Sequence, residues 1–276
     1  MCYRCYLPAR HCWCGSITPM RTRTKFVILM HPYEFKRIKA NTGRLTHLCL
    51  ADSELHIGEN FDGHEAVQAL INDPRNYPVL LYPGRDAINL SAKPGAEGGG
   101  QGDSIAEGAA AGSALHSLRA QLDQRRLVVF LLDATWRLVR PMLRLSTSLQ
   151  RLPKVMFTNA APSRYIIKRQ PEPGCLSTLE ATHELLLALE RTGLDHYAMP
   201  EQMIDLFMRM QQFQIERTAE NRRLGISRHA PKAKRVNGAP AQPAQPVRPK
   251  RRRIFPPGAT STMQPAPGLN AAQPRN

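Results

Sequence analysis

The amino-acid sequence predicts an α/β domain in which helices cover both faces of a mostly parallel sheet. Short apolar runs of strand length alternate along the chain with longer helical patterns, and this alternation is typical of parallel sheets. The run at 127–132 (LVVFLL) is apolar without interruption, as expected of a strand that is buried on both faces. A chain of 276 residues is long enough for one such domain with appendages.

The first half of the domain is expected to contain two strands and two helices. The sequence predicts, in order, a strand at 25–30, a charged helix from about residue 33, a half-apolar stretch at 45–57, a helix at 64–72 and a strand at 78–82. Residues 91–117 are rich in Gly, Ala and Ser. We therefore expect them to form a flexible insertion inside the domain.

The second half resumes the same pattern. It predicts a helix at 115–125, the strand at 127–132, a helix at 136–145, a strand near 154–158, a helix within 177–193 and a final helix at about 200–223. Ser177 or Thr178 can cap the helix within 177–193, and Glu180 completes a capping box there. Gly193 is the expected end of that helix.

Positive charge is concentrated at the carboxyl end of the chain. The formal net charge is +16, and residues 228–276 contain ten Lys or Arg and no Asp or Glu, so residues 1–227 keep +6. This Pro-, Ala- and Gln-rich tail has almost no large apolar residues, and we expect it to be disordered. A basic body with a more basic tail favours a polyanionic partner, most simply nucleic acid.

The sequence predicts neither a targeting segment nor a membrane partner. The amino terminus has no apolar stretch of the signal-peptide type, and the longest apolar runs, at 26–30 and 127–132, are far too short to cross a bilayer. We therefore expect a soluble, cytoplasmic protein. In that compartment thiols stay reduced, so clustered cysteines indicate metal binding rather than disulfides.

Residues 1–20 form a cysteine cluster with the spacing C-x2-C-x6-C-x-C. The four expected metal ligands are Cys2, Cys5, Cys12 and Cys14. Four thiolates at this spacing predict a closed, tetrahedral zinc site, whose role is structural because no coordination position stays open. His11 is the alternative to one of the thiolates.

Polar side chains directly follow the strand at 127–132. Asp133, Thr135 and Trp136 come after it with no turn residues between. In open α/β sheets ligands bind outside the carboxyl ends of the strands, so a ligand-binding or catalytic site is expected at these residues. The competing interpretation is a strand whose following helix is capped by Asp133, with Trp136 in the core.

Six segments of the chain carry a resemblance when they are taken together and in order. They are Cys2-x-Arg4-Cys5 with Cys12-x-Cys14, His31-Pro32-x-Glu34 followed by Asn41-Thr42-Gly43-Arg44-Leu45, Tyr82-Pro83-Gly84, Asp133-x-Thr135-Trp136, Ser163-x-Tyr165-x-x-x-Arg169, and Leu176-Ser177-Thr178-Leu179-Glu180-Ala181. In these segments, over roughly residues 1–210, the chain resembles the DTW-domain family of tRNA-uridine aminocarboxypropyltransferases. Ala134 stands where many members carry Gly.

The resemblance implies a knotted fold related to the SPOUT methyltransferases, with S-adenosylmethionine as the donor. It further implies transfer of the donor's 3-amino-3-carboxypropyl group to N3 of a tRNA uridine, with release of methylthioadenosine. Bacterial members of the family suggest a uridine of the variable loop, and a D-loop uridine is the alternative. Residues 21–227 are then the catalytic domain.

The expected catalytic residues are Asp133, Thr135 and Trp136. Uridine N3 carries a proton at neutral pH, so a nearby carboxylate can act as a general base. Asp133 is either this base or the group that holds the donor's ammonium. Thr135 can bind a uracil carbonyl or cap a helix, and Trp136 either stacks on an extruded base or belongs to the core.

Two further sets of residues are expected to bind the donor and the RNA. The donor-binding candidates are Tyr82, Pro83, Gly84, Leu132, Leu176, Ser177, Thr178 and Glu180. The RNA-binding candidates are His31, Thr42, Arg44, Arg137, Arg140, Lys168 and Arg169. Free N–H groups at a helix start suit a carboxylate or ribose hydroxyls, and basic side chains suit phosphates. The competing roles are helix capping for Glu180, a core position for His31 and solvated positions for the basic residues.

Two other functions stay open at this point. One is an S-adenosylmethionine-dependent RNA methyltransferase of the SPOUT type, and the other is a non-catalytic, zinc-containing RNA-binding protein. Against the second, Asp133, Thr135 and Trp136 are all present. A protein that only binds RNA has no use for a carboxylate directed at a polyanion.

Overall fold

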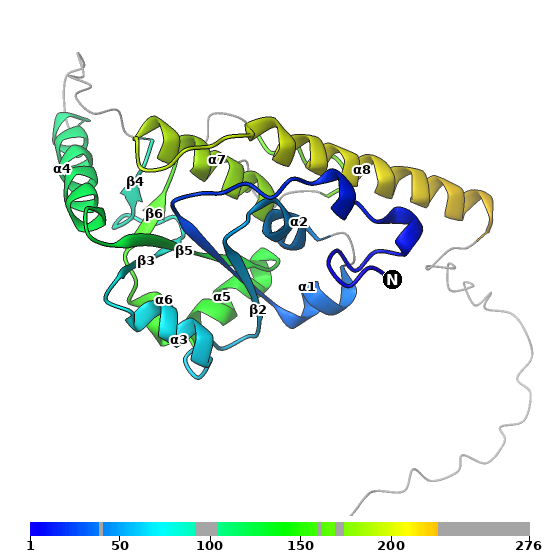
Figure 1. The fold of residues 1–276 in the computed structure, drawn as a ribbon, viewed down its shortest axis with the longest axis horizontal. Helices are drawn as coiled ribbons and strands as arrows, with labels where there is room; N and C mark the ends of the chain where they lie inside the picture. The colour runs from blue at the N-terminus through cyan, green and yellow to red at the C-terminus, as the bar shows by residue number, and fades with distance from the viewer. Residues whose placement is uncertain (39–40, 92–103, 159–161, 169–173, 226–276) are drawn as a thin grey trace, which may run out of the picture. The chain divides into compact units, whose positions relative to one another are not determined.

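The computed structural model describes residues 1–38, 41–91, 104–158, 162–168 and 174–225 (Figure 1). The basic tail at 228–276 lies outside these residues, so its expected disorder stays a prediction. Within the described part, no helix combines the length and the apolar character that a membrane span needs.

One six-stranded sheet forms the centre of the described chain. Its strands are β1 (Lys25–Met30), β2 (Ser53–Ile57), β3 (Asn76–Leu81), β4 (Ile88–Asn89), β5 (Arg126–Asp133) and β6 (Lys154–Met156). They follow the order β2-β1-β5-β3-β6-β4, and each of the described strand pairs is parallel. The prediction of a mostly parallel sheet is therefore confirmed.

Eight helices connect and follow these strands in the described residues. They are α1 (Pro32–Arg37), α2 (Thr42–Cys49), α3 (Glu65–Asn72), α4 (Ser104–Leu122), α5 (Trp136–Leu145), α6 (Thr147–Gln150), α7 (Thr178–Arg191) and α8 (Pro200–Arg223). Two short 3-10 turns, Ala9–His11 and Cys14–Ser16, lie in the cysteine segment.

Helices cover both faces of the sheet, as the sequence predicted (Figure 1). Side chains of β1 alternate between the faces: Phe26 and Ile28 pack with residues of α2, α7 and α8, whereas Val27 and Leu29 pack with residues of α3, α5 and α6. All four are fully buried. This two-sided burial explains why β1 and β5 are apolar throughout instead of alternating with polar residues.

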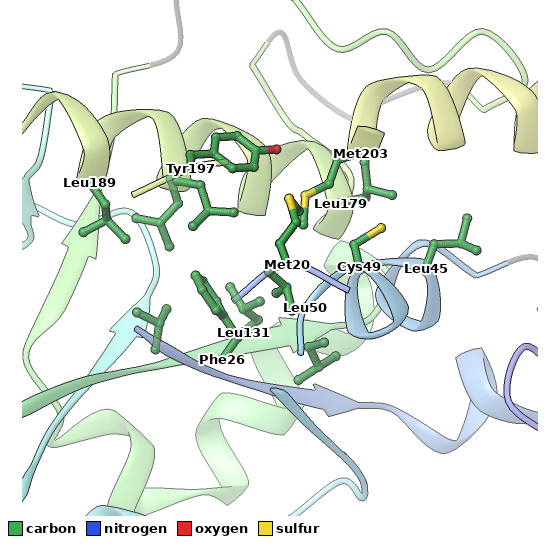
Figure 2. Close-up of a cluster of buried hydrophobic side chains, with 14 of the residues drawn as sticks. Met20, Phe26, Leu45, Cys49, Leu50, Leu131, Leu179, Leu189, Tyr197 and Met203 are labelled. Carbon is green, nitrogen blue, oxygen red and sulfur yellow. The ribbon is translucent and has the colours of Figure 1, made fainter. Parts of the chain in front are cut away.

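The larger of the two cores lies between the sheet and α7 (Figure 2). Phe26 of β1 and Leu131 of β5 belong to it together with Leu179 and Leu189 of α7. Met203 of α8 is fully buried in the same core. Truncation of a side chain such as Phe26 to Ala typically costs about 3–5 kcal/mol in a core of this kind.

Two expected elements differ from the structure. The half-apolar stretch at 45–57 contains the end of α2 and then β2, which begins at Ser53 after a turn. The expectation of a flexible insertion over 91–117 was wrong for 104–117, which belong to α4. Alanine is the residue most favourable to helix, so the Ala-rich half of the insertion continues the expected helix backwards. Residues 92–103 lie outside the described residues.

The cysteine segment packs against the larger core and against α8. Cys5, Leu7 and Trp13 are buried members of the larger core. The backbone N–H of Thr18 donates to the Gln202 side chain of α8 at 2.8 Å. The amino-terminal residues are therefore held by both apolar and polar contacts.

Candidate active site and metal centre

A cavity of about 500 Å³ lies at the carboxyl ends of the sheet's central strands. Its walls come from segments that follow β1, β3, β5 and β6 and from the start of α7; they include Glu34, Asn41, Thr42, Tyr82, Pro83, Leu132, Asp133, Thr135, Trp136, Arg137, Phe157, Tyr165, Lys168, Leu176, Ser177 and Thr178. This is the edge at which open parallel sheets bind ligands. The volume also lies in the range typical of small-molecule sites.

Asp133 is the last residue of β5 and is only 3% exposed. Its Oδ1 accepts a hydrogen bond from Thr178 Oγ1 at 2.6 Å. Its Oδ2 has no hydrogen-bond partner among the described residues. Burial, together with the negative charge of Glu34, raises the pKa of Asp133 to about 6, although the hydrogen bond from Thr178 lowers it. This carboxyl group therefore changes its protonation state close to neutral pH, as a general base should.

The backbone of α2 approaches this carboxyl group at Gly43. A Cβ atom at Gly43 would lie 2.5 Å from Asp133 Cγ and 2.5 Å from Oδ2, so only glycine fits. Gly43 is in the first turn of α2, whose N-cap Asn41 accepts a hydrogen bond from Arg44 N at 3.0 Å. The positive end of the α2 dipole thus lies next to the carboxylate and favours its ionised form.

A second buried carboxylate lines the cavity. Glu34 of α1 is 5% exposed, and its Oε2 accepts a hydrogen bond from Asn41 Nδ2 at 3.1 Å. Sequence reasoning identified Glu34 only as part of a motif and missed it as a site residue. Its position four residues after the end of β1 was the signal, because β1 and β5 are neighbours and Met30 pairs with Asp133.

Thr135 and Trp136 lie at the start of α5. Thr135 is the N-cap residue, but its side chain makes no capping hydrogen bond. Trp136 is 38% exposed and lines the cavity, so its indole is not a core residue. Both side chains are therefore available to a ligand.

The start of α7 has the predicted capping box. Ser177 Oγ accepts from Glu180 N at 3.3 Å, and Glu180 Oε2 accepts from Ser177 N at 3.0 Å. Glu180 Oε1 also accepts from Arg164 N at 2.6 Å. Glu180 is buried and does not line the cavity. These contacts favour the capping role for Glu180, because its oxygens hold the segment around Arg164 against α7; donor binding by this residue stays a prediction.

The other expected donor-binding residues separate into two groups. The cavity is lined by Tyr82, Pro83, Leu132, Leu176, Ser177 and Thr178. Gly84 is not among its lining residues. A Cβ atom there would meet the Asp86 side chain at 2.9 Å, so this glycine makes room for a neighbour in its own turn rather than for a ligand.

Three of the expected RNA-binding residues, Thr42, Arg137 and Lys168, also line the cavity. Arg140 is exposed on α5 but does not line it. Arg169 lies outside the described residues.

Arg44 and His31 have structural contacts instead. Arg44 is 4% exposed, donates to the Phe35 carbonyl at 2.6 Å and lies over the rings of Tyr6 and Phe35. The expectation that it contacts RNA phosphates was wrong, because its guanidinium is enclosed. His31 Nδ1 caps α1 by accepting from Tyr33 N at 3.0 Å, and the cavity does not include His31.

The four amino-terminal cysteines converge. All four Sγ atoms of Cys2, Cys5, Cys12 and Cys14 lie within 4.8 Å of one another. The Cys2–Cys14 and Cys5–Cys12 separations are 3.8 and 3.7 Å. A zinc–sulfur bond of about 2.3 Å requires sulfur atoms about 3.8 Å apart in a tetrahedron. The cluster therefore has the donor type and spacing to hold a metal ion. His11 instead packs against the ring of Phe213.

Two relatives found by sequence comparison carry the same name. A protein named tRNA-uridine aminocarboxypropyltransferase 2 from Drosophila melanogaster is 29% identical over 196 residues, which cover 68% of this chain and 66% of the relative. The protein of the same name from Mus musculus is 26% identical over 226 residues, or 80% of this chain and 65% of the relative. The chain thus spans slightly less than two thirds of the length of these relatives.

These relatives are animal proteins, so the variable-loop expectation, which came from bacterial members, stays a prediction. No solved structure gives a significant match to the chain. Residues 1–215 match the model of the DTW domain, which is more than three quarters of the chain. The chain is therefore a member of the DTW domain family.

Proposed function

We propose that the protein is a tRNA-modifying transferase that moves the 3-amino-3-carboxypropyl group of S-adenosylmethionine to N3 of a tRNA uridine. The observation that carries this proposal is the cavity, in which a buried carboxyl group with a pKa of about 6 lies close to an exposed indole. The names of the relatives support the same reaction. We place the reaction in the cytoplasm.

The donor is a sulfonium, and it supplies an activated carbon and a good leaving group. Uridine N3 forms a bond with Cγ of the methionine arm, the S–Cγ bond breaks, and its electron pair stays on sulfur to give methylthioadenosine. Asp133 accepts the N3 proton, and Thr178 fixes its carboxyl group through the 2.6 Å hydrogen bond. General-base assistance of this kind is typically worth about 10²–10⁴-fold in rate.

The cavity walls fit a nucleoside with an amino-acid arm. Tyr82, Pro83, Leu132 and Leu176 offer apolar and aromatic surface for the adenine. Ser177 and Thr178 open α7, where hydroxyl and backbone N–H groups suit the ribose or a carboxylate. Trp136 at the start of α5 offers a stacking surface for the uracil.

The RNA is held, we propose, by basic groups around this cavity and by the tail. Arg137 and Lys168 line the cavity, and Arg140 follows on the same helix as Arg137. Residues 228–276 add ten positive charges. These groups suit phosphates, which fix the orientation of an RNA without reading its sequence.

The cysteine cluster is proposed to hold a structural zinc ion. The 3.7 and 3.8 Å sulfur separations support this ion, and four soft donors leave no position for a substrate. Backbone hydrogen bonds from Cys5 and Arg4 lower the pKa of the Cys2 thiol, whereas burial raises the pKa of the Cys14 thiol. A bound cation would favour the thiolate form of both.

The knotted, SPOUT-type topology is also a proposal. The parallel order β2-β1-β5-β3-β6-β4 supports it because such a sheet needs several crossover connections. A crystal structure of the domain tests it, because a knot is visible directly in the chain trace.

Isotope transfer tests the reaction. Purified protein is incubated with tRNA and donor labelled either in the methionine carboxyl carbon or in the methyl group. We expect carboxyl label to enter the tRNA and methylthioadenosine to appear only when tRNA is present. Methyl label in the RNA, with adenosylhomocysteine as the product, would instead establish the methyltransferase alternative. No label from either donor would establish an RNA-binding protein without this activity.

A further inference from the structure

The cavity contains two buried carboxylates in different surroundings. Asp133 ends β5, and Glu34 lies in α1 directly after the neighbouring strand β1. Asp133 accepts a hydrogen bond from the Thr178 hydroxyl, and Glu34 accepts one from the Asn41 amide, which also lies close enough to lower the pKa of Asp133. Two carboxylates in one cavity with different partners are suited to different tasks.

Glu34 has no cationic partner in the described part of the protein. No Lys, Arg or His nitrogen of these residues forms an ion pair with it, and the hydrogen bond that its Oε2 accepts comes from the neutral Asn41 amide. A carboxylate that is 95% buried is costly unless a charge compensates it. The side chain lines the cavity, so the compensating cation can come from a ligand.

The charges on the cavity wall match the zwitterionic arm of an amino acid. Glu34 and Asp133 supply the negative side, and the Lys168 ammonium supplies a positive group that also lines the cavity. Lys168 lies 5.4 Å from the centre of the Tyr165 ring. An α-ammonium and an α-carboxylate on one carbon therefore each find a complementary group.

We propose that Glu34, fixed by Asn41, binds the α-ammonium of the donor's amino-acid arm, and that Asp133 is thereby free to take the proton from uridine. This inference rests on the proposed function and assigns to separate residues the two roles that were alternatives for Asp133. Asn41 is a positioning residue, because it acts through Glu34.

A ligand series crossed with variants tests the assignment. The probes are adenosylhomocysteine, its desamino analogue, which lacks only the ammonium, and methylthioadenosine, which lacks the whole arm. The variants are Glu34→Gln, which keeps an oxygen for the Asn41 amide, and Asp133→Asn. Glu65→Gln on α3 is the matched control, because Glu65 is exposed and does not line the cavity. Dissociation constants are measured by calorimetry, and thermal unfolding verifies that each variant folds.

Glu34→Gln is expected to weaken adenosylhomocysteine about ten- to a hundredfold, as for loss of a charged hydrogen bond. Its affinities for the desamino analogue and for methylthioadenosine should stay within about twofold of the unmodified protein, and Asp133→Asn should bind all three probes nearly normally. Equal weakening of all three probes by Glu34→Gln, or no weakening, would overturn the inference alone. An ammonium-selective loss in Asp133→Asn, with none in Glu34→Gln, would assign the ammonium to Asp133. Failure of the unmodified protein to bind any probe would overturn the inference and the proposed function together.

Discussion

The cysteine cluster and the cavity assemble their polar groups in opposite ways. All four thiols come from the first fourteen residues and meet within 4.8 Å. The cavity instead collects side chains between Glu34 and Ala181, which meet only because the parallel sheet places strand ends side by side. A site built from a short segment can be identified from spacing alone, whereas a site built from strand ends depends on strand order.

The two regions also differ in the partners that their polar atoms have. The sulfurs face one another at separations that suit one shared metal ion. In the cavity, one oxygen of Asp133 has a partner and the other has none among the described residues. If the proposed ion is bound, the first arrangement stabilises the fold. If Asp133 is the proposed base, the second keeps a proton acceptor available at some cost in stability.

The largest effect is expected at the proposed metal site. We expect the protein to contain about one zinc per chain, and Cys5→Ser to lose the metal and several kcal/mol of stability, because structural zinc contributes directly to folding. Metal analysis and thermal unfolding measure both effects. Cys175→Ser is the control, since Cys175 lies outside the cluster. A freshly purified protein without zinc would contradict the assignment.

The next largest effect is expected at Asp133. Asp133→Asn keeps the shape of the side chain but cannot accept a proton, so turnover should fall about a hundredfold or more while donor binding changes little. Single-turnover kinetics at saturating donor measure the change. A collapse of donor affinity with normal turnover at high donor concentration would mean that Asp133 is an anchor.

The pH dependence provides a second test of the same residue. The base must be ionised, so kcat/KM should rise about tenfold per pH unit below pH 6 and level off above the pKa of about 6. Stability should move the other way. Because the folded pKa lies above the ordinary value of 3.8, the native state binds more protons between about pH 4 and 6, and the free energy of unfolding falls as the pH rises through that window. Asp133→Asn should remove both dependences.

A smaller effect is expected where α2 touches the carboxyl group. Gly43→Ala places a Cβ atom 2.5 Å from Asp133 Cγ, so the carboxyl group or the helix must move. We expect a loss of about 1–3 kcal/mol in stability, as for other overpacked sites, together with reduced turnover. Gly63→Ala is the matched control, because nothing lies within 4 Å of a Cβ atom there. Normal turnover in Gly43→Ala would show that the close contact does not matter for catalysis.

The smallest effect on chemistry is expected from the tail. Deletion of 228–276 removes ten positive charges, so tRNA binding should weaken and the dependence of log affinity on log salt should become shallower. Turnover at saturating tRNA should stay nearly unchanged. Deletion of 257–276, which removes only Arg275 among the basic residues, is the control. Equal effects of the two deletions would exclude charge as the cause.

Sequence patterns predicted the parts of the molecule that depend on neighbouring residues. The apolar run before Asp133, the Ser177–Glu180 capping box and the cysteine spacing each correspond to one local structure. Side-chain contacts between residues far apart in the sequence were harder to predict. Arg44 was expected at the surface, yet its guanidinium lies between Tyr6 and Phe35. Glu34 was missed because its closeness to Asp133 follows from the pairing of β1 with β5.

Arg44 also connects the cysteine segment to the turn of α2 beside the cavity. It follows Gly43 directly, and its guanidinium covers the ring of Tyr6, the residue after Cys5. A change in the cysteine loop is therefore separated by one stacked side chain from the helix turn that lies against the Asp133 carboxyl group. Protein stored in air, with its thiols oxidised, is expected to lose stability together with turnover, which thermal unfolding and activity measurements follow. Activity should therefore be measured on protein whose thiols have been kept reduced.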